Sequence, residues 1–412
     1  MSSKSGTFLI VGGGLAGAKA AEALRDKDFD GDVVVFAMEE RLPYERPPLS
    51  KEYLAGKKTL DAFTVQPAAW YRDHHVDLRL GTEVTSIDPH GHTVTLPDES
   101  TLHYDRLLLA TGSAPRRPPI PGADADRVHY LRTVDDSDAL NAILTDGSSL
   151  AIVGGGWIGL EVAAGARDRG VNVTVVEAAE LPLLGALGRE NAEVFAKLHR
   201  DHGVDLRLGA TVEEITTDDG AATGLRLGDG STVDADAVLV AVGAAPNTEM
   251  AQRADLAMGE DGGVLVDSAL RTSDPDIFAV GDIASAEHPL FGTRIRTEHW
   301  ANALKQPATA AAGMLGKHAE YDELPYFFTD QYDLGMEYVG HAPEYHRVVF
   351  RGDVDGREFV AFWLDADNRV LAGMNVNVWD VLDDVKSLIR SRSPVDPERL
   401  ADPQQALSGL LA

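Results

Sequence analysis

Two segments of the chain share one spacing of glycines. Residues 8–17 read FLIVGGGLAG and residues 150–159 read LAIVGGGWIG, each an apolar run followed by Gly-x-Gly-x-x-Gly. In such a turn the first glycine allows a tight passage from strand to helix. The second lets the backbone approach a diphosphate, and the third lets the helix pack on the strand. The N–H groups that begin the helix then bind phosphate oxygens. The two turns therefore predict two dinucleotide sites.

The elements around each turn have the same order. A small-residue helix is expected after each turn, at 18–25 and 160–170, and a β-branched strand follows at 33–36 and 171–176. Acidic residues close these strands at Glu39 and Glu177, where a carboxylate can accept hydrogen bonds from ribose hydroxyls. One glycine turn alone is a weak signal. A strand, a helix and an acid around both turns favour nucleotide binding over two purely structural turns.

The repeat extends beyond the turns. VDLRLG occurs at 76–81 and again at 204–209, and closing strands are expected in LLLATGSAP (107–115) and LVAVGAAP (239–246). We therefore predict an α/β protein with two tandem Rossmann-like domains. Two such sites side by side suggest two dinucleotides that exchange electrons.

Composition excludes several kinds of chemistry. The 412 residues contain no cysteine, which rules out thiolate catalysis, disulfides and cysteine-ligated clusters. There are 37 lysines and arginines against 66 aspartates and glutamates, a formal net charge of −29, which argues against binding to nucleic acid or anionic membranes. No apolar run is long enough for a signal peptide or a membrane span, so we expect a cytoplasmic protein.

Further motifs extend the pattern over nearly the whole chain. They are RPPLSK (46–51), ATGSAPR (110–116), YLRT (130–133), VGGGWIGLE (153–161), FAVGD (278–282) and DQYDLG (330–335). With these motifs the chain resembles the FAD-dependent NADH:ferredoxin reductases of bacterial cytochrome P450 and aromatic-ring dioxygenase systems.

The resemblance implies a glutathione-reductase-like architecture of three domains. An FAD-binding domain would span 1–113 and 246–325, an NAD-binding domain 114–245, and a C-terminal α+β domain 326–412. The proline-rich segment RRPPIPG at 116–122 suits a linker, because proline lacks the backbone donor that a sheet needs.

The resemblance also implies which residues bind FAD. Lys51 would lie near the isoalloxazine, on a segment that the adjacent prolines are expected to keep extended, and its charge would stabilise reduced flavin. The remaining residues assigned to FAD are Gly12, Gly14, Ala16, Gly17, Glu39, Arg46, Val84, Arg132, Asp282 and Trp300.

A second set would bind NADH. Glu161 would lie near the nicotinamide, so Lys51 and Glu161 are the expected catalytic residues. Glu177 would bind the adenosine 2′-hydroxyl, and Glu177 with Glu180 would repel a 2′-phosphate, which favours NADH over NADPH. The remaining residues assigned to NAD are Gly154, Gly156, Ile158, Gly159 and Gly243.

Each of these side chains also has a purely structural interpretation. Glu39 could belong to a solvated turn, Lys51 could cap a helix, and Glu161 could be a helix-end acid. In the same way Asp282 could be an N-cap and Trp300 a core residue. No metal site is expected: the pairs His74 and His75, His90 and His92, and His199 and His202 lack ligand spacing and are interpreted as surface histidines.

The expected reaction passes hydride from NADH to FAD and then single electrons to a two-iron ferredoxin. That ferredoxin would feed a cytochrome P450 or a ring-hydroxylating dioxygenase. Lys305, Lys386, Arg390 and Arg392 are candidate docking cations or ordinary solvated ones, Ala308 replaces a docking cation of one relative, and Phe328 is a candidate for the electron exit path. The alternatives are a reductase for rubredoxin or a quinone, and an NADH-sensing flavoprotein like apoptosis-inducing factor. A monomer or weak homodimer is expected.

Overall fold

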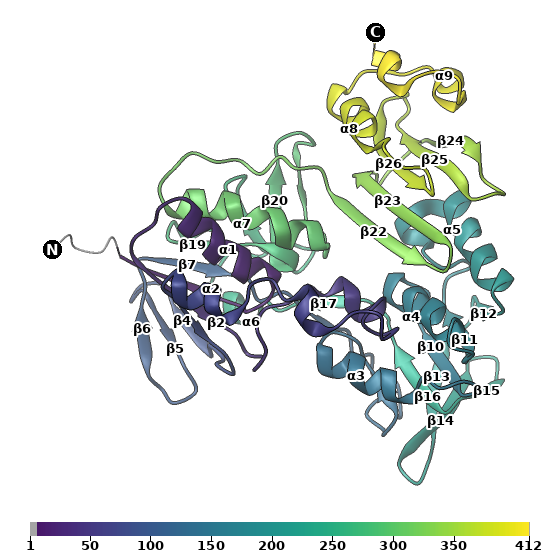
Figure 1. Ribbon diagram of the computed structural model, residues 1–412, viewed down its shortest axis with the longest axis horizontal. Coiled ribbons are helices and arrows are strands. Elements are labelled where there is room, and N and C mark those ends of the chain that lie inside the picture. Colours follow the sequence, from purple (N-terminus) through teal and green to yellow (C-terminus); the bar gives the residue numbers. More distant parts are fainter. Residues whose placement is uncertain (1–5, 412) are drawn as a thin grey trace. The chain divides into compact units, whose positions relative to one another are not determined.

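The computed structural model describes residues 6–411, which divide into two compact units (Figure 1). The first unit takes in the chain as far as Arg46, then Thr59–Ala114 and Ala244–Pro325. The second unit comprises Pro47–Lys58, Pro115–Gly243 and the chain from Tyr326 onward. The short segment 47–58 therefore packs with the second unit, although its sequence neighbours on both sides belong to the first.

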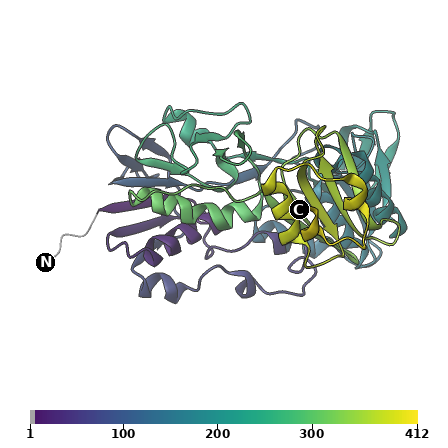
Figure 2. The same cartoon turned by 90° about the horizontal axis from the view of Figure 1, so that it is seen from above.

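The first unit is built on a parallel sheet in the order β19-β7-β1-β2-β3. Its strands are β1 (Thr7–Val11), β2 (Asp32–Phe36), β3 (Val76–Arg79), β7 (Arg106–Leu109) and β19 (Ile277–Ala279). The central residues of β1, β2, β7 and β19 are apolar and buried, as expected of parallel strands that are covered on both faces, whereas the edge strand β3 exposes Asp77. Helix α1 (Leu15–Asp26) packs against α7 (Trp300–Met314), and the two run side by side in both views (Figures 1 and 2).

Smaller elements complete the first unit. Two three-stranded sheets contain β4 (Ser86–Asp88), β5 (Thr93–Thr95) and β6 (Thr101–His103), and β18 (Val264–Val266), β20 (Ala284–His288) and β21 (Thr293–Ile295). A two-stranded sheet pairs β8 (Ser113–Pro115) with β17 (Ala244–Pro246). The short helices are α2 (Ala68–Asp73), α6 (Glu249–Arg253), η2 (Leu60–Phe63) and η3 (Gly281–Ile283).

The second unit repeats the design with a parallel sheet in the order β12-β11-β10-β16-β9. Its strands are β9 (Val128–His129), β10 (Ser149–Val153), β11 (Asn172–Glu177), β12 (Asp205–Leu208) and β16 (Ala237–Val240). An antiparallel sheet adds β13 (Val212–Asp218), β14 (Ala221–Leu227) and β15 (Thr232–Asp234). The helices are η1 (Pro47–Ser50), α3 (Val134–Ile143), α4 (Trp157–Arg167) and α5 (Leu184–Asp201).

The second unit also contains an antiparallel sheet in the order β22-β23-β26-β25-β24. Its strands are β22 (Tyr326–Gln331), β23 (Leu334–Gly340), β24 (Arg347–Asp353), β25 (Glu358–Leu364) and β26 (Val370–Val376), followed by α8 (Leu382–Ser391), α9 (Pro397–Ala401) and η4 (Leu407–Leu411). One buried cluster joins this sheet to α4 and α5 through Leu160, Phe195 and Trp363. The predicted fold class is confirmed.

Candidate functional site

The first glycine turn joins β1 to α1. Gly12 has a φ of +125°, and a Cβ at this position would overlap the carbonyl oxygen of Ala110. A Cβ at Gly17 would overlap the carbonyl oxygen of Gly12, so the close packing of helix on strand requires glycine there. Gly14 is different, because a Cβ built on it meets nothing within 4 Å. It faces open space at the N-terminus of α1, and Ala16 is buried behind it.

The second turn, from β10 to α4, has the same geometry. Gly154 has a φ of +106° and would overlap the carbonyl oxygen of Ala241, while Gly159 would overlap that of Gly154. A Cβ on Gly156 again meets nothing within 4 Å. Neither Gly14 nor Gly156 caps its helix with a side chain, so the first N–H groups of α1 and α4 are available to an anion. Ile158, in the first turn of α4, is 42% exposed.

An acid follows the second strand of each sheet, as predicted. Glu177 ends β11, and its carboxylate accepts hydrogen bonds from the N–H groups of Gly155 at 2.6 Å and Ala179 at 2.8 Å. Glu39 follows β2 and accepts from Arg46 at 2.9 Å and from the hydroxyl of Tyr44. The structure thus pairs two of the residues assigned to FAD, Arg46 and Glu39, with each other.

Lys51 and Glu161 form a buried ion pair in the second unit. The two side chains are 9% and 4% exposed, and Lys51 Nζ lies 2.8 Å from Glu161 Oε2. The hydroxyl of Ser50 donates to the same oxygen, and that of Thr329 donates to Oε1 at 2.7 Å. The expectation of an extended proline segment is wrong, because Pro47–Ser50 form the 3₁₀ helix η1, which turns Ser50 and Lys51 towards α4.

The Lys51 ammonium also lies 5.5 Å from the centre of the Phe328 ring, a cation–π distance. Phe328 and Thr329 both belong to β22. The strand that begins the C-terminal sheet therefore contributes two contacts to the Lys51–Glu161 pair. Neither Ser50 nor Thr329 was assigned a role from the sequence. Their proximity to Lys51 and to DQYDLG was the only available signal.

The other predicted residues lie in defined places. In the first unit Val84 is a core residue at 3% exposure, Asp282 lies within η3 at 9% exposure, and Trp300 begins α7 half-buried. Asp282 is not an N-cap, because Val280 occupies that position of η3. In the second unit Arg132 precedes α3 and donates its backbone N–H to Asp136 at 3.0 Å, and the carbonyl of Gly243 accepts from the N–H of Arg116 at 2.9 Å.

One histidine departs from the prediction of a surface position. His74, His75 and His90 are exposed and His92 and His202 are half-buried, but His199 is fully buried at 0% exposure. Its position on α5 faces the C-terminal sheet, a contact that helix periodicity alone did not reveal, and burial lowers its pKa to about 4. Across residues 6–411 the acidic and histidine side chains form no group that could hold a metal ion. In the same range no helix has the length and apolarity to cross a membrane.

Two protein-family models match this chain and together cover most of it. A family model described as pyridine nucleotide-disulphide oxidoreductase matches residues 6–307, and one described as reductase C-terminal matches residues 326–411. The chain belongs to the pyridine nucleotide-disulphide oxidoreductase family. It is accordingly an oxidoreductase that uses FAD and NADH.

Individual relatives are similar over almost their full length. The ferredoxin–NAD(+) reductase component of the anthranilate 1,2-dioxygenase system from Burkholderia cepacia is 40% identical, with 98% of this chain and 99% of the relative covered. Putidaredoxin reductase from Pseudomonas putida is 36% identical, with 98% and 96% covered. The crystal structure of a covalent putidaredoxin reductase–putidaredoxin complex matches with a TM-score of 0.95, 34% identity and 99% of both chains covered.

The residues present fit two dinucleotides. At each glycine turn, backbone contacts require glycine at the first and third positions, whereas a Cβ at the second would meet no atom of residues 6–411 within 4 Å. That combination suits a diphosphate approached closely by backbone N–H groups. The carboxylate of Glu177, held beside the second turn by two backbone N–H groups, suits a ribose hydroxyl pair.

Proposed function

We propose that this oxidoreductase passes electrons from NADH through FAD to a two-iron ferredoxin, which supplies a cytochrome P450 or a ring-hydroxylating dioxygenase. The observation that favours this function most is the buried Lys51–Glu161 pair, which lies in the same unit as the second glycine turn. The similarity to a ferredoxin–NAD(+) reductase component over 98% of this chain supports the choice of acceptor.

FAD is assigned to the first glycine turn. Gly12, Gly14, Ala16 and Gly17 would surround its diphosphate, because α1 begins there without a side-chain cap. Glu39 would receive the adenosine ribose, with Arg46 holding its carboxylate in place. The other residues assigned to FAD are Lys51, Val84, Arg132, Asp282 and Trp300.

NADH is assigned to the second glycine turn. Gly154, Gly156 and Gly159 would surround its diphosphate, and Gly243 would lie towards the nicotinamide end. Ile158 is also assigned to NADH. Glu177 would accept the 2′-hydroxyl, and its negative charge with that of Glu180 disfavours the 2′-phosphate of NADPH. Glu161 would contact the nicotinamide carboxamide.

Lys51 and Glu161 would act together on the two cofactors. FAD supplies the conversion of a two-electron hydride into single electrons when bound. The Lys51 ammonium would place a positive charge where negative charge develops, and its burial strengthens that effect by excluding water. Glu161 would hold Lys51 and orient the nicotinamide. With no cysteine in the chain, no dithiol can relay the electrons onward.

The three-domain division would serve this relay. We assign 1–113 and 246–325 to FAD, 114–245 to NAD and 326–412 to a C-terminal domain, with residues 47–58 packed in the unit that contains the NAD turn. The protein would act in the cytoplasm as a monomer or weak homodimer.

Docking of the ferredoxin would use local positive charge, since the chain is acidic overall. Two candidate cations already have acidic neighbours: Lys305 pairs with Glu323 and Lys386 with Asp383, both at 3.1 Å. Arg390 lies on the same helix as Lys386. A docking role for Lys305 or Lys386 would therefore involve competition with an existing ion pair.

Steady-state cytochrome c reduction tests the function. The protein loaded with FAD is given NADH and a panel of two-iron ferredoxins, with rubredoxin and a quinone as control acceptors. We expect rapid cytochrome c reduction only with a two-iron ferredoxin present. Equal rates with rubredoxin or the quinone would contradict the proposed acceptor. Flavin bleaching that decays slowly, with no ferredoxin-dependent turnover, would indicate an NADH-sensing protein instead.

A further inference from the structure

A continuous chain of buried polar side chains leads away from Glu161 inside the second unit. Thr329 Oγ1 donates to Glu161 Oε1 at 2.7 Å, and Gln331 Nε2 donates to Thr329 Oγ1 at 3.1 Å. The other polar atom of the Gln331 amide, Oε1, lies 2.8 Å from His199 Nε2. None of these four residues is more than 5% exposed, so water does not replace any link.

The hydrogen positions along this chain follow from the donors and acceptors available. The single hydrogen of the Thr329 hydroxyl points to the Glu161 carboxylate, so its oxygen must accept from the Gln331 amide nitrogen. The amide oxygen of Gln331 then faces His199 and can only accept. His199 must therefore have its hydrogen on Nε2, which leaves Nδ1 as an acceptor. Tyr332 provides a hydroxyl 3.4 Å from that Nδ1.

The state of His199 agrees with this assignment. Burial lowers its pKa to about 4, so the imidazole is neutral near pH 7 and has one hydrogen to place. A protonated imidazole would donate from Nδ1 as well, so the Tyr332 hydroxyl would then have to accept instead of donate. The neutral Nε2–H tautomer satisfies both ring nitrogens with the partners present.

The far end of the chain is anchored to two elements. His199 comes from the last turn of α5, whereas Thr329 and Gln331 point to one face of β22 because they are two positions apart in a strand. Next to them the ring of His202 stacks on Tyr332 with centroids 3.7 Å apart.

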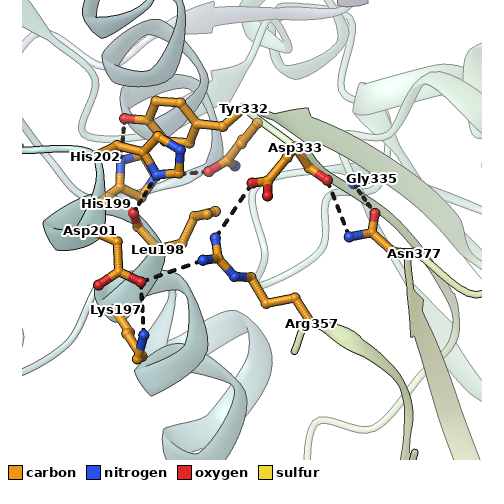
Figure 3. A network of polar contacts seen from close by, with 11 residues as sticks. Lys197, Leu198, His199, Asp201, His202, Tyr332, Asp333, Gly335, Arg357 and Asn377 are labelled. Carbon is orange, nitrogen blue, oxygen red and sulfur yellow. Dashed lines mark hydrogen bonds and ion pairs between the residues drawn. The ribbon is translucent and has the colours of Figure 1, made fainter. Parts of the chain in front are cut away.

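An arginine adds a second attachment between α5 and the C-terminal sheet. Arg357 lies 3.4 Å from both Asp201, at the end of α5, and Asp333, in the turn after β22 (Figure 3). Lys197 contacts the same Asp201 at 2.8 Å. The helix end that presents His199 is therefore held in place at several points.

We propose that Thr329, Gln331 and His199 are positioning residues that hold the Glu161 carboxylate, and through it the Lys51 ammonium, in one orientation. This rests on the proposed function only in placing Lys51 and Glu161 at the flavin and nicotinamide. Glu161 receives three donors at two oxygens, from Lys51, Ser50 and Thr329, and only Thr329 reaches Oε1. The C-terminal sheet thus contributes to the reaction through the orientation of a residue on α4.

The first experiment uses anaerobic stopped-flow reduction of the FAD-loaded protein by NADH. Thr329→Val keeps the side-chain shape and removes the donor, so we expect the limiting rate to fall roughly 10-fold, the factor for a lost hydrogen bond to a charged group. Thr329→Ser, the matched control, should recover most of the rate. In a Glu161→Gln background, Thr329→Val should change the rate by less than about twofold, because both act on one carboxylate.

Two outcomes separate the positioning role from the proposed function. An unchanged limiting rate in Thr329→Val, or an equal further loss in the Glu161→Gln background, would overturn the positioning role alone. A wild-type rate in Glu161→Gln would overturn the assignment of Glu161 and the proposal with it. Flavin content and circular dichroism confirm that each variant folds.

The second experiment needs no variant of Thr329 and no turnover. Nitrogen-15 NMR of the imidazole rings in the FAD-loaded protein reports the tautomer of each histidine, and the His199 signals are those lost in His199→Gln. We expect a neutral Nε2–H tautomer from pH 8 to pH 6. The Nδ1–H tautomer, or a protonated ring at pH 7, would overturn the chain of hydrogen bonds.

Discussion

Replacing glycines within one turn by alanine separates the cofactor role from the structural role. A Cβ at Gly17 would lie well under 3.0 Å from the carbonyl oxygen of Gly12, so α1 must move away from β1. Overpacking of this kind costs about 3 kcal/mol, which lowers the Tm of the first unit, whose size is that of a single domain, by roughly 6–12 °C. A Cβ built on Gly14 has no atom of the described residues within 4 Å. Gly14→Ala should therefore cost less than about 1 kcal/mol, mainly through a weaker N-cap.

For FAD binding, by contrast, Gly14→Ala should have a large effect. A methyl group on Gly14 would occupy the space in front of the first N–H groups of α1. Losing one charge-assisted hydrogen bond to the diphosphate, about 1.5–3 kcal/mol, raises the dissociation constant of FAD roughly 10- to 150-fold. Without FAD, Gly14→Ala should thus melt within roughly 4 °C of the wild type, and it should bind FAD weakly.

The assay combines thermal melting of the flavin-free protein with titration of FAD by fluorescence quenching. Gly156→Ala is the matched control at the second turn, and we expect it to leave FAD affinity unchanged and raise the KM for NADH. Wild-type FAD affinity in Gly14→Ala would refute the assignment of FAD to the first turn. A wild-type Tm in Gly17→Ala would refute the steric argument.

Three further predictions follow from the same geometry. Glu177→Ala should raise the NADPH/NADH ratio of kcat/KM roughly 10-fold, since it removes a charge from the ribose site proposed for NADH; an unchanged ratio would remove Glu177 from its proposed role. Because burial lowers the pKa of His199 to about 4, the unfolded chain binds a proton below pH 6.5 that the folded one rejects. On this account the free energy of unfolding should fall by about 3 kcal/mol between pH 6.5 and pH 4. Denaturant unfolding should show a loss smaller by that amount in His199→Gln than in the wild type. The same loss in both proteins would contradict the prediction. Phe328→Leu should slow ferredoxin-dependent cytochrome c reduction more than NADH–ferricyanide reduction, and equal slowing of both would exclude Phe328 from the exit path.

The predictions for the proline segment and for His199 were wrong because the sequence pattern there describes only a local preference. Adjacent prolines at 47 and 48 indicated an extended segment, but Pro47–Ser50 form a 3₁₀ helix that packs against α3 and α4. Proline restricts φ to a value that both conformations share, so tertiary packing made the choice. His199 was likewise interpreted as a surface residue, because nothing in its neighbours indicates that the C-terminal sheet covers α5.

The sequence by itself determined the two glycine turns, their strands and helices, and the acid after each second strand. These features depend on short-range geometry, since a glycine with positive φ and a helix packed on a strand are specified within a few residues. Only the tertiary structure decided which side chains surround Glu161. Ser50 and Thr329 are 111 and 168 residues away from it along the chain. Contacts over such separations depend on how whole sheets and helices bury their apolar faces, and the local spacing of residues does not predict them.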